Sequence, residues 1–125
     1  MDEEGLTHQI LSCAMQVHTT LGPGLLESAY EACLAYELSL NQIRFAKQIE
    51  CPVTYGELKI DAGYRLDILV DNKVIVELKS VERINALHQA QLLTYLKLTG
   101  MHIGLLINFN VPHLRDGIKR MVNHK

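Results

Sequence analysis

Two acids and a lysine in the middle of the chain have types and spacing that suit metal-assisted chemistry. Asp67 is followed, after nine residues, by the run Glu77-Leu78-Lys79. A hard cation such as Mg²⁺ binds through one or two carboxylates plus water, and it lowers the pKa of that water and offsets charge on a phosphate oxygen. A lysine two residues after one acid could orient the attacking water or stabilise the transition state.

A second interpretation of the same residues is purely structural. On a polar sheet face, Asp67 could pair with Lys79, and Glu77 with Arg65, as an ordinary network of ion pairs. Spacing alone leaves both interpretations open, so the local structure around the acids has to be considered.

Both acids fall on short segments with the alternation of a β-hairpin. The segments are Tyr64–Val70 and Lys73–Lys79, and they are separated by Asp71-Asn72, which is a turn signal. Alternate residues place Asp67 on one face of the first strand and Glu77 with Lys79 on one face of the second. The opposite face is apolar throughout, with Leu66, Ile68, Val70, Val74, Val76 and Leu78.

The loop length decides whether the two acids meet. A strict two-residue turn would make Asp67 and Glu77 point to opposite faces of the hairpin. A three-residue loop, Asp71-Asn72-Lys73, brings the two acids side by side. The same loop makes the apolar faces coincide, because it pairs Val70 with Val74 and Leu66 with Leu78. We therefore predict the three-residue loop.

The remaining pattern predicts an α/β chain in the order α-α-β-β-β-α-β-α, with a mixed sheet flanked by helices. The Leu21-Gly22-Pro23-Gly24 break separates the first two helices, and Gly100 occupies a left-handed helix cap. The expected helices are Glu3 to about Thr20, Leu25 to Leu40, Ala86–Thr99 and His113 to about Val122. The other expected strands are Arg44–Tyr55, bent at Pro52, and the apolar run Met101–Phe109; Gly56 and Gly63 mark an exposed connection.

Length and composition are those of an ordinary globular chain. The 125 residues predict one domain, 1–125, and 48% hydrophobic residues with 21% charged argue against disorder. No apolar run is long enough to span a membrane and the start is acidic, so the expected location is the cytoplasm without membrane association. The three cysteines include no CxxC pair, which argues against zinc or iron–sulfur sites.

The charges are unevenly distributed along the chain. Residues 1–43 contain six acids and no Lys or Arg, while the rest holds all twelve basic residues and the other eight of the fourteen acids. A basic part of a chain can engage phosphates, although a solvated helix face explains it equally well. The charge pattern is thus compatible with a nucleic-acid partner without requiring one.

Asp67 with Glu77-Leu78-Lys79, on a hairpin followed by a helix, resembles the PD-(D/E)xK nuclease superfamily, with Leu66 where the superfamily name has Pro. More narrowly, the segment Gly24–Tyr30 resembles the signature of the GxxExxY protein family, a compact branch of that superfamily. The likeness extends over nearly the whole chain, including Tyr64–Asp67, Val76–Lys79 and Leu105–Phe109. It implies a restriction-endonuclease-like α-β-β-β-α-β core.

The resemblance also implies roles for individual residues. Asp67 and Glu77 become metal ligands for Mg²⁺ or Mn²⁺, with the Leu78 backbone carbonyl as a further contact, and Lys79 becomes the catalytic lysine. Glu27 corresponds to the helix-borne acid that many such nucleases add to the metal site.

The segment Gln91–Tyr95, in the helix expected after the hairpin, resembles the QxxxY motif of RecB-like exonucleases. Gln91 and Tyr95 lie four residues apart on one helix face, where they could position a phosphate or the lysine. A polar helix edge that only packs on the sheet is the alternative. Arg65 and Arg83 are candidates for phosphate contact, with simple ion pairing as the alternative.

Two other residues are better explained by structure than by chemistry. His18 precedes the Gly-Pro-Gly turn and suits a hydrogen-bonded helix end, although it could approach the site. Tyr30 suits the core, although its hydroxyl could orient Glu27.

The resulting expectation is a nuclease that hydrolyses phosphodiester bonds, in DNA rather than RNA, with metal-activated water. The alternative is a catalytically weak or inactive nuclease fold that binds nucleic acid or a protein partner. Because so small a domain offers limited surface for gripping a duplex, a homodimer is also compatible with the sequence.

Overall fold

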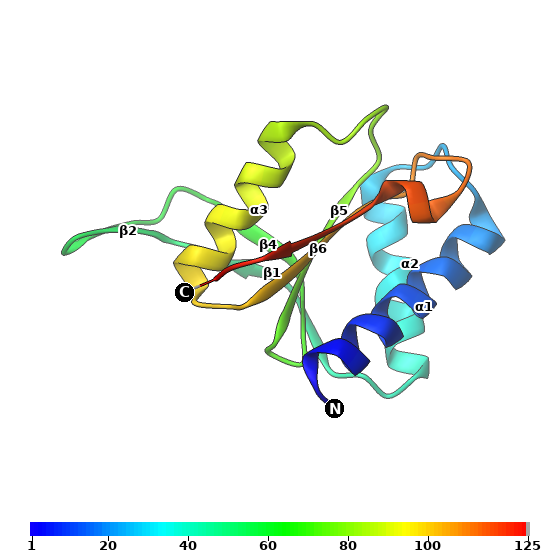
Figure 1. Cartoon of the computed structure of the whole chain (residues 1–125), viewed down its shortest axis with the longest axis horizontal. Helices are drawn as coiled ribbons and strands as arrows, with labels where there is room; N and C mark the ends of the chain where they lie inside the picture. Colours follow the sequence, from blue (N-terminus) through cyan, green and yellow to red (C-terminus); the bar gives the residue numbers. More distant parts are fainter. Residues whose placement is uncertain (125) are drawn as a thin grey trace.

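The computed structural model describes residues 1–124 and has a five-stranded central sheet with helices on both faces (Figure 1). Its elements are α1 (Glu3–Leu21), α2 (Glu27–Leu40), β1 (Phe45–Glu50), β2 (Val53–Tyr55), β3 (Leu58–Ile60), β4 (Arg65–Val70), β5 (Val74–Lys79), α3 (Ala86–Thr99), β6 (Ile103–Asn108), the 3₁₀ helix η1 (Leu114–Gly117) and β7 (Ile118–Val122).

The sheet is mixed, as the sequence predicts. Its strand order is β1-β4-β5-β6-β7, in which β5 and β6 are parallel and all other neighbours are antiparallel. Helices α1 and α2 pack on one face and α3 packs on the other, giving two hydrophobic clusters separated by the sheet. The succession α2-β1-β4-β5-α3-β6 is the expected restriction-endonuclease-like core.

The first two helices are held by specific end contacts. Helix α1 begins after Asp2, whose side chain accepts a hydrogen bond from the Gly5 N–H, and it ends before Gly22, whose φ of 68° is left-handed. The buried Tyr30 hydroxyl then donates to the Gly22 carbonyl at 2.6 Å and accepts from the Leu25 N–H at 3.1 Å. None of the helices within residues 1–124 is long and apolar enough to cross a membrane.

The β4–β5 hairpin has the predicted register. Val70 lies opposite Val74, so that Asp71, Asn72 and Lys73 form a three-residue loop. Asp71 and Asn72 both have positive φ, which these short polar side chains tolerate better than most.

One part of the register prediction is wrong, and the reason lies at the acids. The β4–β5 ladder ends at the pair Ile68 and Val76, so Leu66 is not paired with Leu78. Leu66 packs in the cluster under α3, whereas Ile68 packs under α1 and α2. The alternation of β4 therefore changes face at Asp67, where side-chain carboxylates replace the backbone ladder.

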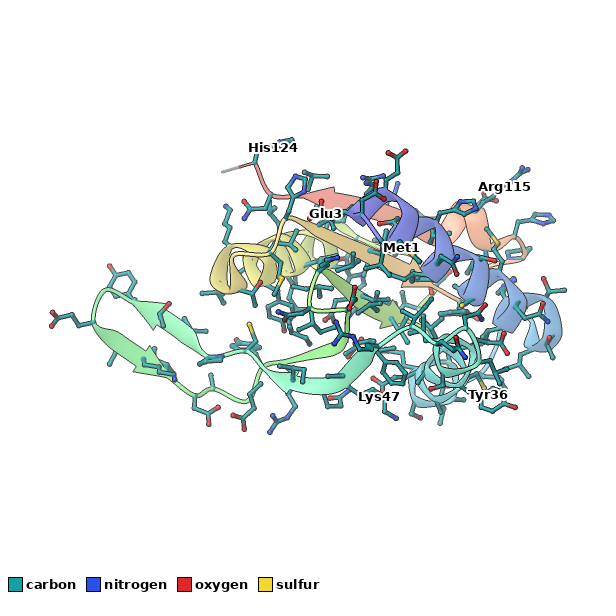
Figure 2. All side chains as sticks on the ribbon, turned by 90° about the horizontal axis from the view of Figure 1, so that it is seen from below. Met1, Glu3, Tyr36, Lys47, Arg115 and His124 are labelled. Atoms are coloured by element: carbon teal, nitrogen blue, oxygen red, sulfur yellow. The ribbon has the colours of Figure 1, made fainter. Side chains whose placement is uncertain are left out.

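The expected single strand Arg44–Tyr55 is two strands, because Cys51 and Pro52 interrupt it and Pro52 has no N–H to donate. Strand β2 instead pairs with β3, which the sequence analysis did not predict, across a turn at Gly56 with φ 60°. We call β2, β3 and their turn the arm. The arm extends away from the body of the protein (Figure 2).

The predicted helix from His113 to about Val122 is also wrong. Only Leu114–Gly117 is helical, as a single 3₁₀ turn, and Ile118–Val122 pairs antiparallel with β6. All six residues of β6 are buried, and its second edge needs a hydrogen-bonding partner. Gly117 permits the approach, since a Cβ there would lie 2.2 Å from the Asn108 carbonyl oxygen.

Candidate active site

Asp67 and Glu77 lie side by side where the β4–β5 ladder opens. The Asp67 N–H donates to Glu77 Oε1 at 3.2 Å, and the Leu78 N–H donates to Asp67 Oδ2 at 2.8 Å. Each carboxylate therefore uses one oxygen to hold the neighbouring strand. Among the hydrogen bonds described, none uses Asp67 Oδ1 or Glu77 Oε2, so each acid keeps an oxygen for a further partner.

The environment of the pair makes two negative charges costly. Glu77 is only 6% exposed. Burial, and then the charge of Asp67, raise the pKa of Glu77 to about 8, while the hydrogen bond from the Asp67 N–H and then the charge of Lys79 act in the opposite direction. Burial and the Glu77 charge also raise the pKa of the Cys51 thiol. Glu77 thus lies in a largely water-excluded place beside a second carboxylate.

The structural interpretation as an ion-pair network does not hold. Within residues 1–124 no Lys, Arg or His nitrogen lies within 4.0 Å of Asp67 or Glu77. Arg65 pairs with Glu50 at 3.3 Å instead, and both of these side chains are well exposed. The buried Glu77 and the half-buried Asp67 therefore have no ion-pair partner among residues 1–124 and are available to a bound cation.

A small cavity of about 210 Å³ adjoins the pair and brings part of the predicted site together. Glu27, Asp67 and Leu78 all line it, so the helix-borne acid does approach the hairpin. Glu31 and Gln48 line it as well, and the Gln48 amide donates to Glu31 Oε1 at 2.7 Å. Sequence reasoning missed these two, although Glu31 follows Glu27 by four residues and so shares its helix face.

Lys79 ends the central strand β5, where several contacts fix the backbone. Its carbonyl accepts from the Phe109 N–H at 3.0 Å. The next residue, Ser80, donates through its hydroxyl to the Leu25 carbonyl at 2.5 Å. The buried Asn108 side chain then holds Val81 through both its backbone N–H and its carbonyl. The α1–α2 turn and the end of β6 thus position the lysine.

Helix α3 places the other predicted pair beside, rather than inside, this cavity. Gln91 and Tyr95 line a separate groove of about 340 Å³, which His88 and Tyr64 also line. Tyr95 nevertheless packs in the cluster that contains Leu66 and Ile75, which flank the acids on β4 and β5. Burial, and then the charge of Glu77, raise the pKa of Tyr95 to about 12. In the described part of the chain, Gln91 forms no hydrogen bond with either Asp67 or Glu77.

The two arginines predicted to contact phosphate are not gathered at the carboxylates. Arg65 forms the ion pair with Glu50, which is the alternative that the sequence left open. Arg83 is exposed in the connection between β5 and α3, beyond Lys79.

Comparison with known families bears directly on this geometry. A family model described as the PD-(D/E)XK nuclease superfamily matches residues 4–121. The chain belongs to the PD-(D/E)XK nuclease superfamily. The matched range includes Glu27, Asp67, Glu77 and Lys79, so it covers every residue of the candidate site. A search of curated proteins and a search of solved structures gave no match.

Nucleases of the PD-(D/E)XK superfamily generally depend on divalent metal ions, and the donor set fits such an ion. No three His, Cys, Asp or Glu side chains in residues 1–124 come close enough to hold an ion by themselves. Two carboxylates suffice for Mg²⁺, which usually keeps several waters. The raised pKa of Glu77 also favours a bound cation, because the charge of the cation would offset the repulsion between the Glu77 and Asp67 carboxylates.

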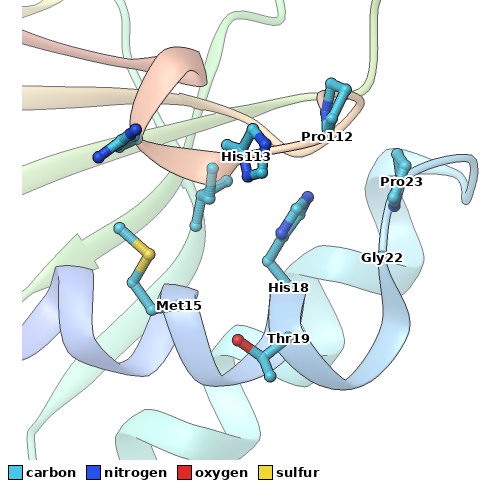
Figure 3. Close-up of a pocket in the computed structure, with 9 residues that line it drawn as sticks. Met15, His18, Thr19, Gly22, Pro23, Pro112 and His113 are labelled. Atoms are coloured by element: carbon cyan, nitrogen blue, oxygen red, sulfur yellow. The ribbon is translucent and has the colours of Figure 1, made fainter.

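A larger cavity of this nuclease-superfamily domain, about 590 Å³, lies elsewhere (Figure 3). It is located between α1 and the β6–β7 connection, and His18 and His113 line it. A ring nitrogen of His18 bonds the Val111 carbonyl at 2.7 Å, which ties α1 to that connection. His18 is therefore the hydrogen-bonded helix-end residue that the sequence favoured. Tyr30 is likewise a core residue, stacked on Phe109 with ring centroids 4.5 Å apart.

Proposed function

We propose that this chain hydrolyses phosphodiester bonds in nucleic acid, DNA rather than RNA, with Mg²⁺ or Mn²⁺. One observation carries the proposal: the buried Glu77 lies beside the half-buried Asp67, and neither carboxylate forms an ion pair with a cation of residues 1–124. Such a pair is costly to fold unless it binds something positive. Its place in a nuclease-superfamily domain supports a catalytic ion as that partner.

Each residue then has a distinct task. Asp67 and Glu77 would hold the ion, with Glu27 and the Leu78 carbonyl as further candidate contacts, because Glu27 and Leu78 line one cavity with Asp67. A bound Mg²⁺ supplies a more acidic water and offsets charge on the phosphate. Lys79, fixed at the strand end, orients the attacking water or the phosphate through its ammonium group.

We further propose that the chain is a GxxExxY-type member of the superfamily and forms one domain over 1–125. The signature Gly24–Tyr30 supports this, because its Tyr30 holds the α1–α2 turn and its Glu27 lines the cavity.

The test is cleavage of labelled single- and double-stranded DNA with Mg²⁺, with Mn²⁺ and in EDTA. We expect activity only with metal, and a loss of about 100-fold or more in Asp67→Asn and in Lys79→Met. Asn keeps an oxygen that can accept from the Leu78 N–H, so this variant removes charge without opening the hairpin.

Matched controls are Asp61→Asn in the exposed loop after β3 and Lys97→Met on the exposed face of α3. Both should cleave as the unaltered protein does. Cleavage that persists in EDTA, or in both site variants, would contradict the mechanism. Nucleic acid that is bound but never cut would instead support the catalytically inactive alternative.

A further inference from the structure

The groove beside α3 has a lining unlike that of the carboxylate cavity. It has a volume of about 340 Å³ and lies between α3 and the base of the arm. No Asp, Glu, Lys or Arg lines it; the lining is aromatic and aliphatic, with a few neutral polar groups. Such a site suits a flat, uncharged ring rather than a phosphate, which would need cations or helix N–H groups.

One wall of the groove is the aromatic ring of Tyr64, whose backbone is held by a hydrogen bond. Tyr64 is 45% exposed, and its ring lies 6.3 Å from that of Tyr95 at an interplanar angle of 60°. The Tyr64 carbonyl accepts a 2.8 Å hydrogen bond from the Cys51 N–H, which closes the base of the arm. Because its backbone is held and its side chain is partly exposed, Tyr64 offers a ready surface for stacking.

Several polar side chains line the same groove and form no hydrogen bond with other residues of the described part of the chain. In the described part of the chain, the side chains of Gln91 and Thr94 and the Tyr95 hydroxyl form no hydrogen bond with other residues. The amide of Gln91 can both donate and accept, as the edge of a nucleobase requires. A stacking face combined with such groups matches the two ways in which proteins hold an unstacked base.

Tyr95 connects the groove to the region of the carboxylate pair. Tyr95 lines the groove and packs in one buried cluster with Leu66, the neighbour of Asp67 on β4, and with Ile75, two residues before Glu77 on β5. A strand whose phosphate lies at Asp67 and Glu77 therefore passes close to the groove.

We propose that this groove binds one unpaired nucleobase of the substrate strand, stacked on Tyr64 and contacted at its edge by Gln91. The proposal rests on the proposed nuclease function and specifies its substrate as single-stranded nucleic acid or an unpaired end. A base inside a duplex stays stacked on both sides, so it cannot enter without being unpaired.

The test measures binding of the 125-residue chain, in EDTA, to a fluorescent oligothymidylate of about 10 nucleotides by anisotropy. The comparators are an abasic strand of the same length and a matched duplex. We expect the abasic strand and the duplex to bind about tenfold more weakly or worse. Tyr64→Ala should lose a similar factor with oligothymidylate and none with the abasic strand, whereas Tyr64→Trp should retain binding.

Tyr55→Ala is the matched control, because Tyr55 is an exposed tyrosine of the arm that does not line the groove. It should bind as the unaltered protein does. If Tyr64→Ala fails to fold, Thr94→Trp fills the groove from an exposed helix position and should block the base-dependent part of binding.

Equal affinity for oligothymidylate and the abasic strand would overturn the proposal, as would unchanged binding by Tyr64→Ala or Thr94→Trp. A change of oligomeric state in Tyr64→Ala, seen by sedimentation, would overturn it too by identifying a second copy as the occupant. Because the measurement needs no metal, base-dependent binding without cleavage would refute only the catalytic proposal.

Discussion

Asp67 and Glu77 each have two tasks at the scale of single residues. One oxygen of each carboxylate accepts a backbone hydrogen bond that fastens β4 to β5. In the proposed function, the remaining oxygens would be the ligands of a cation. Because the two tasks use different atoms, an amide substitution can separate them, since it keeps an acceptor and removes the charge.

The metal-free protein should lose stability as the pH rises. The pKa of Glu77 is about 8 in the folded chain against an ordinary value of 4.5, so between these values the folded state binds more protons than the unfolded state. The free energy of unfolding should therefore be highest below about pH 4.5 with respect to this group, and fall as the pH rises to about 8. Urea denaturation in EDTA across this range measures the slope.

Glu77→Gln is the variant that isolates the cause. It should flatten the slope and stabilise the metal-free protein at pH 8 by a few kcal/mol, because it removes a buried charge. Saturating Mg²⁺ should stabilise the unaltered protein at pH 8 and leave the variant nearly unaffected. An unchanged slope in Glu77→Gln would show that another group titrates.

At the scale of elements, the α1–α2 turn links the core to the site. The Tyr30 hydroxyl holds the turn from the inside through Gly22 and Leu25, and the Leu25 carbonyl in turn receives the Ser80 hydroxyl beside Lys79. The turn therefore connects the core residue Tyr30 to Ser80, at the end of the central strand β5.

Tyr30→Phe should destabilise the protein by about 1–3 kcal/mol, because it leaves the Gly22 carbonyl without its buried donor. It should also reduce cleavage, since the contact to Ser80 depends on the same turn. Urea denaturation and the cleavage assay measure the two effects. Tyr36→Phe removes a hydroxyl from a side chain that is 63% exposed and should change neither.

The hairpin loop could be predicted from the sequence because its length depends on residues that are close together in the chain. Matching apolar faces and adjacent acids both required Asp71-Asn72-Lys73, and the structure has that loop. The face of Leu66 could not be predicted in this way. It depends on the carboxylates replacing the ladder at Asp67, and that arrangement appears only when the full hairpin is assembled.

Pairing between distant segments explains the other errors. The periodicity of Ile118–Val122 is compatible with a helix, and it becomes a strand because the edge of β6 is open to it. The arm has no core contacts that would give its strands a clear apolar face, so β3 was missed. For the site, the resemblance predicts Glu27 at the metal, and the structure places Glu27 in a cavity with Asp67 and Leu78; its role as a metal ligand stays a prediction. The sequence did not indicate that Gln91 lies in a separate groove, because that placement depends on how α3 crosses the sheet.

At the scale of the whole molecule, stability is unevenly distributed. Strands β5 and β6 are central and buried, whereas the arm is a two-stranded hairpin of three residues a strand that stands away from the body. An isolated hairpin of this size is marginally stable.

Amide hydrogen exchange should therefore be slowest in β5 and β6 and close to unprotected rates in β2 and β3. Mass spectrometry of peptides that cover residues 53–60 and 74–79 makes the comparison. The measurement at two protein concentrations is the control, because protection of the arm that increases with concentration would show that another molecule covers it.

The two acids that replace part of the β4–β5 ladder also constrain how this sequence can evolve. If a lineage lost the proposed hydrolysis, it would still need acceptors for the Asp67 and Leu78 N–H groups. Asn at position 67 and Gln at position 77 meet that need, and they relieve the repulsion as well. Drift away from catalysis should therefore leave amides at these two positions, and inactive descendants would be recognisable by that substitution pair.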